Sequence, residues 1–307
     1  MYLICMCWLR GDGTGKTGRD SGRAMLVFSR LSATALIFGL LIGSGGAALA
    51  AFGHPVPWQM DLQGSVTPIM DDITGFNTFL FWITSGITLF VLILLGIVMV
   101  RFNARANPTP SRTTHNTPLE IAWTIIPVVI LVTIAVPSFR LLFLELDVPK
   151  PDLTLKATGK QWYWSYAYPD NGNFEFDSTL VADKDLKPGQ PRLLTVDNEM
   201  VVPVNKIVHV LVAGADVIHS FTVPSFGIRI DAVPGRLNDT WFKATREGTY
   251  RGQCSELCGT DHAFMPIVVR VVSESDFNTW VTQAKQKFAG AESAPQNVLA
   301  AAGAPAK

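Results

Sequence analysis

Two long apolar runs without charged residues dominate the pattern along the first half of the chain. They cover residues 79–100 and 121–139. A helix that crosses a lipid bilayer needs about 20 predominantly apolar residues, so each run is long enough to span one. Three arginines lie in the short connection between residues 101 and 112, and positive charge is typical of cytoplasmic loops. We therefore expect a two-helix transmembrane hairpin over residues 76–148, with both of its ends outside the cytoplasm.

The second half of the chain shows a different pattern, in which short apolar or alternating segments are separated by turn residues. The segments predicted as strands are residues 153–157, 162–168, 192–196, 206–212, 220–223 and 266–272. Asn-Gly and Pro-Gly pairs between them are typical of turns. Many short strands at this spacing favour an antiparallel sandwich or barrel, and about 130 residues are enough for one hydrophobic core. We therefore expect an all-β domain over residues 149–288, which ends in a helix from residue 275.

The N-terminal residues have the features of a secretory signal peptide. Residues 25–50 contain Arg30, an apolar core and the small residues of Ala48-Leu49-Ala50, which resemble a cleavage site. Residues 1–24 precede this segment and are expected to be a non-structural extension. Cleavage after Ala50 would place the new N-terminus outside the cytoplasm, which agrees with the orientation predicted for the hairpin.

Composition distinguishes two further segments and limits the kinds of partner. Residues 51–75 are polar and punctuated by Pro and Gly, so we expect an extracytoplasmic lead. Residues 289–307 are rich in Ala, Pro and Gly and are expected to form a disordered tail. The 25 basic and 25 acidic residues give a formal net charge of zero, which excludes a strongly basic nucleic-acid-binding protein. The 48% of hydrophobic residues instead favours a membrane protein with a soluble part.

Candidate chemistry is concentrated in the segment Cys254–Met265, which contains two thiols, an imidazole and a thioether. Thiolate and thioether are soft ligands that suit copper, whereas zinc prefers cysteine, histidine and carboxylate. A mononuclear blue-copper site needs only one cysteine, so the second thiol has to be accounted for, and two thiolates can bridge two copper ions. A second imidazole would come from another loop, where His219 is the best candidate. In an oxidising compartment, Cys254 and Cys258 alone would more often form a disulfide.

The order of these residues resembles a known family. The pattern C-S-E-L-C-G-x-x-H-x-x-M, preceded by H-S-F-T-V-P-S-F-G and D-A-V-P-G-R, is similar to the copper A site in subunit II of bacterial-type cytochrome c oxidase, a haem–copper oxidase. The resemblance implies a cupredoxin-like fold for the β domain and a site for two copper ions. The implied ligands are the side chains of His219, Cys254, Cys258, His262 and Met265 and the backbone carbonyl of Glu256. It also implies that the side chain of Glu256 binds magnesium at the interface with the large subunit.

The resemblance also implies an activity. Such a subunit accepts electrons from cytochrome c and passes them to the haem-bearing subunit I, where O2 is reduced and protons are pumped. By the same resemblance, Trp162 in the run Q-W-Y-W-S-Y is where electrons enter. Glu120, in E-I-A-W-T-I-I-P, is similar to a carboxylate at the mouth of the K proton channel, although from the residues alone it is an interfacial carboxylate or a helix-capping partner. An acidic cluster in residues 170–185 would attract a basic partner such as cytochrome c.

A location, a set of partners and two alternatives follow. The signal peptide, the hairpin and the resemblance place the protein in a bacterial inner membrane as a multi-pass protein, with the copper domain on the periplasmic side. Expected partners are subunit I and other oxidase subunits, cytochrome c and membrane lipid, but no nucleic acid. One alternative is a copper chaperone or thiol–disulfide protein that uses the C-x-x-x-C pair, although such proteins usually have a βαβ pattern. The other is a copper-free subunit II of a quinol oxidase, although the intact ligand set argues against it.

Overall fold

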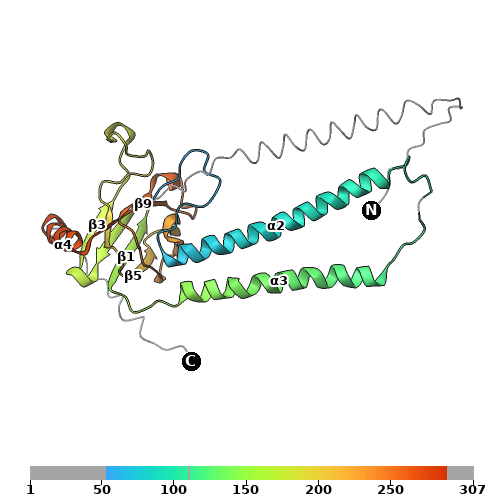
Figure 1. The fold of residues 1–307 in the computed structure, drawn as a ribbon. Helices are drawn as coiled ribbons and strands as arrows, with labels where there is room; N and C mark the ends of the chain where they lie inside the picture. The colour runs from blue at the N-terminus through green and yellow to red at the C-terminus, as the bar shows by residue number, and fades with distance from the viewer. Residues whose placement is uncertain (1–52, 110, 289–307) are drawn as a thin grey trace. The chain divides into compact units, whose positions relative to one another are not determined.

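The computed structural model describes residues 53–109 and 111–288 of the 307-residue chain. This part of the chain consists of a helical hairpin and a β domain (Figure 1). The fold class expected from the sequence, two apolar helices followed by an all-β sandwich, is confirmed. The expected extension at residues 1–24, signal peptide at residues 25–50 and tail at residues 289–307 lie outside the described residues.

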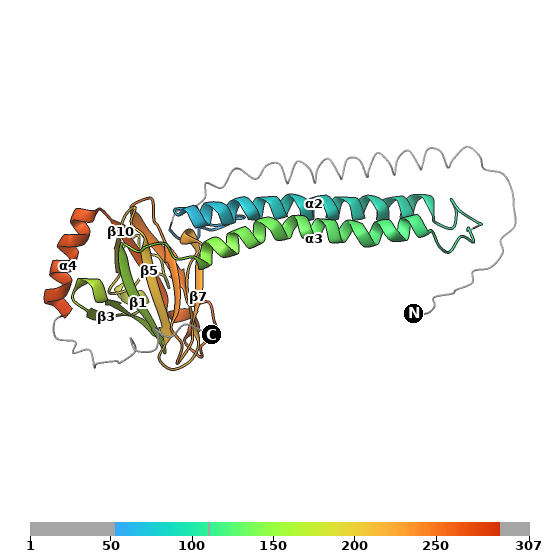
Figure 2. The same ribbon diagram turned by 90° about the horizontal axis from the view of Figure 1, so that it is seen from below.

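The hairpin consists of α2 (Pro68–Arg101) and α3 (Thr117–Leu146), which lie side by side (Figures 1 and 2). Both helices are long and apolar enough to cross a membrane. No residue of α3 is buried, and in α2 only Ile69 and Met70 are. Apolar side chains are therefore exposed along both helices, which is the pattern of segments that face lipid or other membrane subunits.

The first helix begins earlier than the apolar pattern predicts. Since α2 starts at Pro68, residues 68–75 belong to the hairpin and not to the polar lead that we expected to extend to residue 75. The hydroxyl of Thr67 accepts a hydrogen bond from the amide of Met70 at 3.1 Å, which caps the helix. Pro68 occupies a first-turn position, where no backbone amide is needed. This capping signal, and not the apolar run, determines where the helix starts.

The residues just before α2 are hydrogen-bonded to the β domain. The hydroxyl of Thr67 donates to the carbonyl of Phe226 at 2.7 Å, in the 3-10 helix η3 (Pro224–Phe226). The amide of Val66 donates to the carbonyl of Ser225 at 3.2 Å. These bonds attach the residues at the start of α2 to η3 of the β domain.

The β domain forms three sheets among the described residues (Figure 1). The five-stranded sheet has the order β3 (Phe174–Ser178), β2 (Tyr163–Tyr168), β1 (Leu153–Lys160), β5 (Val208–Gly214) and β8 (Asn238–Phe242). The three-stranded sheet has the order β4 (Met200–Pro203), β10 (Pro266–Val272) and β9 (Gly248–Gln253). The two-stranded sheet consists of β6 (His219–Val223) and β7 (Ile228–Ala232).

Strand pairing is mixed, which corrects the purely antiparallel sandwich that the sequence pattern favours. β1 pairs with β5 in parallel, and β4 pairs with β10 in parallel. Parallel strands need a long crossover connection. The crossover from β1 to β5 contains β2, β3 and β4 together with two 3-10 helices, η1 (Pro169–Asn171) and η2 (Asp183–Asp185). It holds no α-helix, so the described domain lacks the βαβ unit that is typical of thiol–disulfide proteins.

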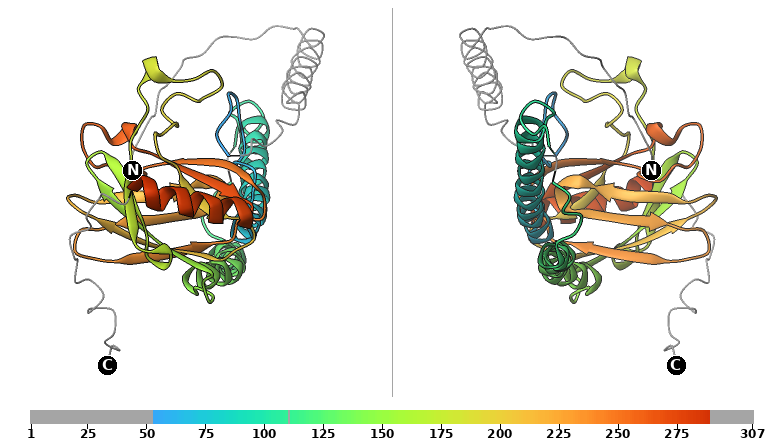
Figure 3. Two further views of the ribbon diagram at one scale, coloured as in Figure 1. Left: turned by 90° about the vertical axis from the view of Figure 1, so that its left-hand side faces the viewer. Right: turned by 90° about the vertical axis from the view of Figure 1, so that its right-hand side faces the viewer.

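The aromatic run of β2 is part of the hydrophobic core. Trp164 and Tyr168 are fully buried. Trp164 packs edge-on against Phe221 of β6, with ring centroids 5.4 Å apart. The ring centroid of Tyr168 lies 5.1 Å from that of Trp280 in α4 (Glu274–Phe288), a helix that packs against β3 and β4. Figure 3 shows this helix in dark red beside the strands of the β domain. Trp162 differs from these residues, because it precedes the strand and is only half-buried.

One predicted strand is wrong. Residues 192–196 form turns, and Val196 makes only an isolated bridge to Leu180. Pro191 precedes the segment, and Leu193 has a φ of 63°, which belongs to the left-handed region and cannot continue a strand. The segment therefore cannot form a regular strand, although most of its residues are apolar.

Candidate metal centre

Two separate segments supply the predicted ligands. His219 is the first residue of β6, and Cys254–Met265 connects β9 to β10. The amide of Ser255 donates to the carbonyl of Ser220 at 3.2 Å, so the two segments are joined directly beside the ligands. Packing of β6 against β9 thus brings together residues that are far apart in the sequence.

Two buried thiols form the middle of the site. The Sγ atoms of Cys254 and Cys258 are 3.9 Å apart, and the two residues are only 6% and 4% exposed. Both are free thiols. The disulfide that the sequence left open is therefore not present in this structure.

Each thiol has its own imidazole. Nδ1 of His219 lies 4.0 Å from Sγ of Cys254. Nδ1 of His262, in the 3-10 helix η4 (His262–Phe264), lies 3.4 Å from Sγ of Cys258. The centre therefore consists of two Cys–His pairs that meet at the two sulfur atoms.

Two weaker donors complete the set. Sδ of Met265 lies 3.5 Å from Sγ of Cys258, and the backbone carbonyl oxygen of Glu256 lies 3.3 Å from Sγ of Cys254. Met265 is 1% exposed. All six groups that the resemblance implies as ligands thus lie around one centre.

The chemistry of this donor set fits two metal ions better than one. The potential ligand atoms of His219, Cys254 and Cys258 all lie within 4.8 Å of one another. A mononuclear blue-copper site uses one thiolate, two imidazoles and a weak thioether, which would leave one buried thiol without a role. Two ions that share both thiolates use the whole set. Soft sulfur donors together with imidazole also favour copper over magnesium, calcium or manganese.

The surroundings of the two thiols differ. At Cys254, burial raises the pKa, but hydrogen bonds with His219 and with the backbone of Glu256 outweigh it and lower the pKa to about 7. At Cys258, burial and the neighbouring charge on Cys254 raise the pKa to about 12. The first thiol therefore ionises well before the second. A cation that binds both sulfur atoms has to displace the proton of Cys258.

Asp216 orients His219, and the sequence analysis missed it. Nε2 of His219 lies 2.9 Å from Oδ1 of Asp216, so Nδ1 is the ring nitrogen that faces Cys254. Burial lowers the pKa of His219, but its hydrogen bonds with Cys254 and Asp216 outweigh burial and raise the pKa. A carboxylate that holds the second nitrogen of a ligand imidazole is common at metal sites. The sequence did place a carboxylate three residues before the candidate ligand His219. This is a weak indication of a role, because most surface acids are only solvated.

Gln161 is a second residue that the sequence did not reveal. Its backbone amide donates to Oδ2 of Asp216 at 2.7 Å, and its side-chain amide donates to the carbonyl of Cys258 at 3.0 Å. It therefore connects Asp216, the partner of the candidate ligand His219, to the candidate ligand Cys258. Nothing in the pattern signals this contact, since Gln161 and Cys258 are 97 residues apart.

Trp162, predicted as the place where electrons enter, lies beside the same carbonyl. Its indole Nε1 donates to the carbonyl oxygen of Cys258 at 3.2 Å. A Cβ atom at Gly259 would lie 2.9 Å from the Trp162 ring, and Gly259 has a φ of 122°, which favours glycine. The half-buried indole is thus one hydrogen bond away from a predicted metal ligand.

The carboxylate of Glu256, implied as a magnesium ligand, lies beside an arginine. Its Oε2 is 3.8 Å from Nη2 of Arg229, which also donates to the carbonyl of Ser255 at 3.1 Å. Both side chains are exposed. The magnesium role of Glu256 stays a prediction.

Glu120 lies away from the metal donors, in the first turn of α3. Its Oε1 accepts a hydrogen bond from the amide of Asn116 at 3.2 Å, and the side chain of Asn116 accepts one from the amide of Leu119 at 3.2 Å. This reciprocal arrangement caps the helix. The capping interpretation is thus confirmed as a contact, whereas the role in proton uptake stays a prediction.

The acidic cluster of residues 170–185 is partly neutralised by bases from outside it. Asp183 lies 2.7 Å from Arg192, and Asp177 lies 3.6 Å from Lys160. The cluster is therefore less negative than its sequence, which contains a single lysine, indicates.

Comparison with known proteins matches both parts of the chain to one family. The family described as cytochrome C oxidase subunit II, periplasmic domain, matches residues 153–272, and its transmembrane domain matches residues 55–141. The probable cytochrome c oxidase subunit 2 of Rickettsia felis is 52% identical over 247 residues, which are 80% of this chain and 77% of that protein. Cytochrome c oxidase subunit 2 of Cereibacter sphaeroides is 46% identical over 269 residues, covering 80% and 88%. A crystal structure of the periplasmic domain of subunit II from Bradyrhizobium japonicum has 68% identity and a TM-score of 0.44, covering 46% of this chain and 99% of that one.

Proposed function

The chain belongs to the cytochrome c oxidase subunit II family, and we propose that its buried Cys–His centre is the dinuclear copper A site of such an oxidase. As a member of this family it is an electron-transfer subunit of an oxidoreductase and not an enzyme on its own. The proposed ligands are the side chains of His219, Cys254, Cys258, His262 and Met265 and the backbone carbonyl of Glu256.

The contact between two thiols, each with its own imidazole, supports this proposal most strongly. Two copper ions held by these residues would supply one-electron redox chemistry. The role of the protein is to hold the donors still. His219 belongs to β6, and Met265 directly precedes β10, so two donors are fixed by strands. A rigid, buried donor set limits the rearrangement that accompanies each change of charge.

We propose that Trp162 receives the electron from cytochrome c. The haem of a folded partner cannot contact a buried centre, so a large aromatic ring at the surface shortens the gap. The hydrogen bond from the Trp162 indole to the carbonyl of Cys258 supports this role, because it connects the ring to a proposed ligand. The electron then passes to haem in subunit I, where O2 is reduced and protons are pumped.

The same proposal gives the protein a location and further partners. The hairpin lies in the inner membrane of a bacterium, among the other oxidase subunits, and the copper domain faces the periplasm. We propose that Glu256 binds magnesium through its carboxylate at the interface with subunit I. The exposure of that carboxylate supports this role, because a partner subunit can reach it.

We also propose that Glu120 collects protons for the oxidase at the cytoplasmic side. The capping contact makes a clean test possible, because Glu120→Gln keeps an oxygen that accepts from the amide of Asn116 but cannot transfer a proton in the same way. We expect Glu120→Gln to slow steady-state turnover of the assembled oxidase while the copper content stays unchanged. Normal turnover in Glu120→Gln together with slow turnover in Glu120→Ala would show that only the cap matters.

Metal analysis tests the copper site directly. The full chain, purified in detergent and loaded with copper, should bind two copper ions, and Cys258→Ser should bind fewer. Ser255→Ala is the matched control, because this side chain lies in the same loop and donates only to the carbonyl of Gln253. One copper ion in the wild-type chain, or an unchanged copper content in Cys258→Ser, would contradict the dinuclear proposal.

A further inference from the structure

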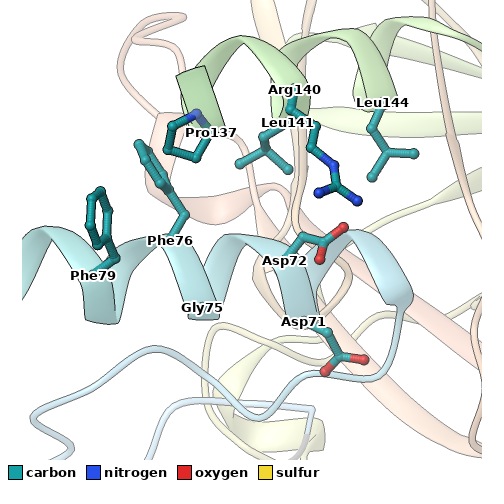
Figure 4. A pocket seen from close by; sticks show the side chains of 9 residues that line it. All are labelled: Asp71, Asp72, Gly75, Phe76, Phe79, Pro137, Arg140, Leu141 and Leu144. Carbon is teal, nitrogen blue, oxygen red and sulfur yellow. The ribbon is translucent and has the colours of Figure 1, made fainter. Parts of the chain in front are cut away.

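A cavity of about 410 Å³ lies between α2 and α3, near the end of the hairpin that leads to the β domain (Figure 4). Asp71 and Asp72 from the first turns of α2 line it on one side, and Arg140 from α3 lines it on the other. Phe76 and Phe79 of α2 line the part farther along the helix. The cavity thus combines charges of both signs with an aromatic, apolar region.

The charged groups of this cavity are not paired with each other. Figure 4 shows the guanidinium of Arg140 and the carboxylate of Asp72 extending into the same space from opposite helices. Within residues 53–109 and 111–288, the side chains of Asp71, Asp72 and Arg140 make no ion pair and no hydrogen bond. Charges at the edge of a membrane are costly unless they meet water or a partner of opposite sign. The space between the helices therefore suits an occupant that carries both signs of charge.

The depth of the cavity in the membrane indicates what that occupant is. Arg140 directly follows the uncharged run of residues 121–139, and Phe79 begins the uncharged run of residues 79–100. The charged groups therefore lie at the edge of the hydrocarbon layer, at the level of lipid headgroups, and Phe79 lies at the level where acyl chains begin. This end of the hairpin is the end joined to the domain that the family describes as periplasmic.

We propose that this cavity binds one zwitterionic phospholipid of the outer leaflet, with an ethanolamine headgroup. The guanidinium of Arg140 matches a phosphate, which it can bind through two parallel hydrogen bonds. The carboxylate of Asp72 matches the primary ammonium, whose hydrogens suit a carboxylate acceptor. One acyl chain would lie against Phe76 and Phe79.

Two other occupants fit less well. A purely anionic headgroup would satisfy Arg140 but would face the carboxylate of Asp72, so the balance of charge favours a zwitterion. A single side chain from a partner subunit carries one sign of charge and would leave the other sign unpaired. The phospholipid satisfies both signs and fills the apolar part as well.

Native mass spectrometry of the assembled oxidase, washed free of endogenous lipid in detergent, tests the proposal. The probes are dioleoyl phosphatidylethanolamine and dioleoyl phosphatidylglycerol, titrated separately. In the wild type, the tightest site should prefer the ethanolamine lipid. Arg140→Gln should weaken binding of both lipids, by about tenfold for one charged hydrogen-bonding partner. Arg140→Lys keeps the charge but loses the two parallel hydrogen bonds, so its affinities should lie between those of the wild type and Arg140→Gln, which guards against a general loss of folding.

Asp72→Asn is the more specific test, because it should change the preference between the ethanolamine lipid and the glycerol lipid. It should weaken binding of the ethanolamine lipid and strengthen binding of the glycerol lipid, so the preference between them falls. Arg101→Gln, at the opposite end of α2, is the matched control and should change neither affinity. Equal affinities in all variants would overturn the proposal. So would an unchanged lipid count in Arg140→Gln combined with weaker retention of subunit I, which would mean that a protein side chain occupies the cavity.

Discussion

The hairpin and the β domain use the same apolar residue types in opposite ways. Leu131 of α3 is 65% exposed, whereas Val210 of β5 is fully buried. The β domain buries its apolar side chains against its own sheets and α4, so its stability is a property of the chain itself. The hairpin leaves its apolar side chains exposed, so its stability depends on what surrounds it. The Cys–His centre, which needs fixed geometry, lies in the β domain, and the exposed apolar side chains that need a surrounding partner lie in the hairpin.

Replacing a glycine with alanine should give the largest difference in stability between the two regions. A Cβ atom at Gly252 of β9 would lie 1.7 Å from the carbonyl oxygen of Thr222 in β6, a clash with backbone that cannot be relieved by rotating a side chain. Gly252→Ala should destabilise the β domain by about 3 kcal/mol, as severe overpacking does. Gly96→Ala in α2 meets nothing within 4 Å and should leave the domain unchanged. Near-ultraviolet circular dichroism of thermal unfolding, on the full chain in detergent, measures both. Equal melting of the two variants would show that the domain is not as tightly packed as the contact between β6 and β9 indicates.

The next largest effect should come from the carboxylate behind His219. Asp216→Ala should lower copper affinity by about 10–100-fold, because the imidazole loses the group that holds its orientation. Asp239→Ala is the matched control, since Asp239 lies 3.1 Å from His209, a histidine that is not a proposed ligand. Competition with a copper chelator gives both affinities. If the two variants lose affinity equally, Asp216 stabilises the fold and does not act on the metal.

A smaller and more specific effect is expected at Trp162. Trp162→Gln should slow reduction of the copper centre by reduced cytochrome c while copper content and binding affinity change little. Trp162→Phe keeps an aromatic ring but loses the indole donor to Cys258, so its rate reports how much that hydrogen bond matters. Stopped-flow absorbance measures the rates. Loss of copper or unfolding in Trp162→Gln would instead mean that the indole is a packing residue.

The smallest effect concerns docking of cytochrome c. Lys160 and Arg192 neutralise part of the acidic cluster, so we expect the combined change Glu175→Gln and Asp185→Asn to lower the association rate by less than about tenfold. The effect should vanish at high salt, because exposed charges are screened over about 8 Å at physiological ionic strength. Asp61→Asn, an exposed acid outside the cluster, serves as the control. A loss that persists at high salt would contradict an electrostatic role.

Sequence analysis predicted the features that depend only on neighbouring residues in a short segment. The two apolar runs and the order of donors in Cys254–Met265 need no knowledge of distant residues, so the hairpin and the clustering of most candidate donors could be predicted. The start of α2 was missed because the cap at Thr67 precedes the apolar run. Residues 192–196 were misread because a left-handed residue interrupts an apolar segment.

The parts that could not be predicted depend on contacts between distant segments. The parallel pairing of β1 with β5 is set by sandwich packing and not by local pattern. Gln161 reaches Cys258 only because the loop after β1 lies beside the ligand loop. The cavity that contains Asp72 and Arg140 appears only once α2 and α3 lie side by side.

Electron paramagnetic resonance of the oxidised full chain, loaded with copper in detergent, tests the central claim most directly. If both thiolates of Cys254 and Cys258 bridge two copper ions, one unpaired electron should couple equally to two copper nuclei. Coupling to a single nucleus, or a disulfide between the two cysteines that persists when copper is supplied, would contradict the account.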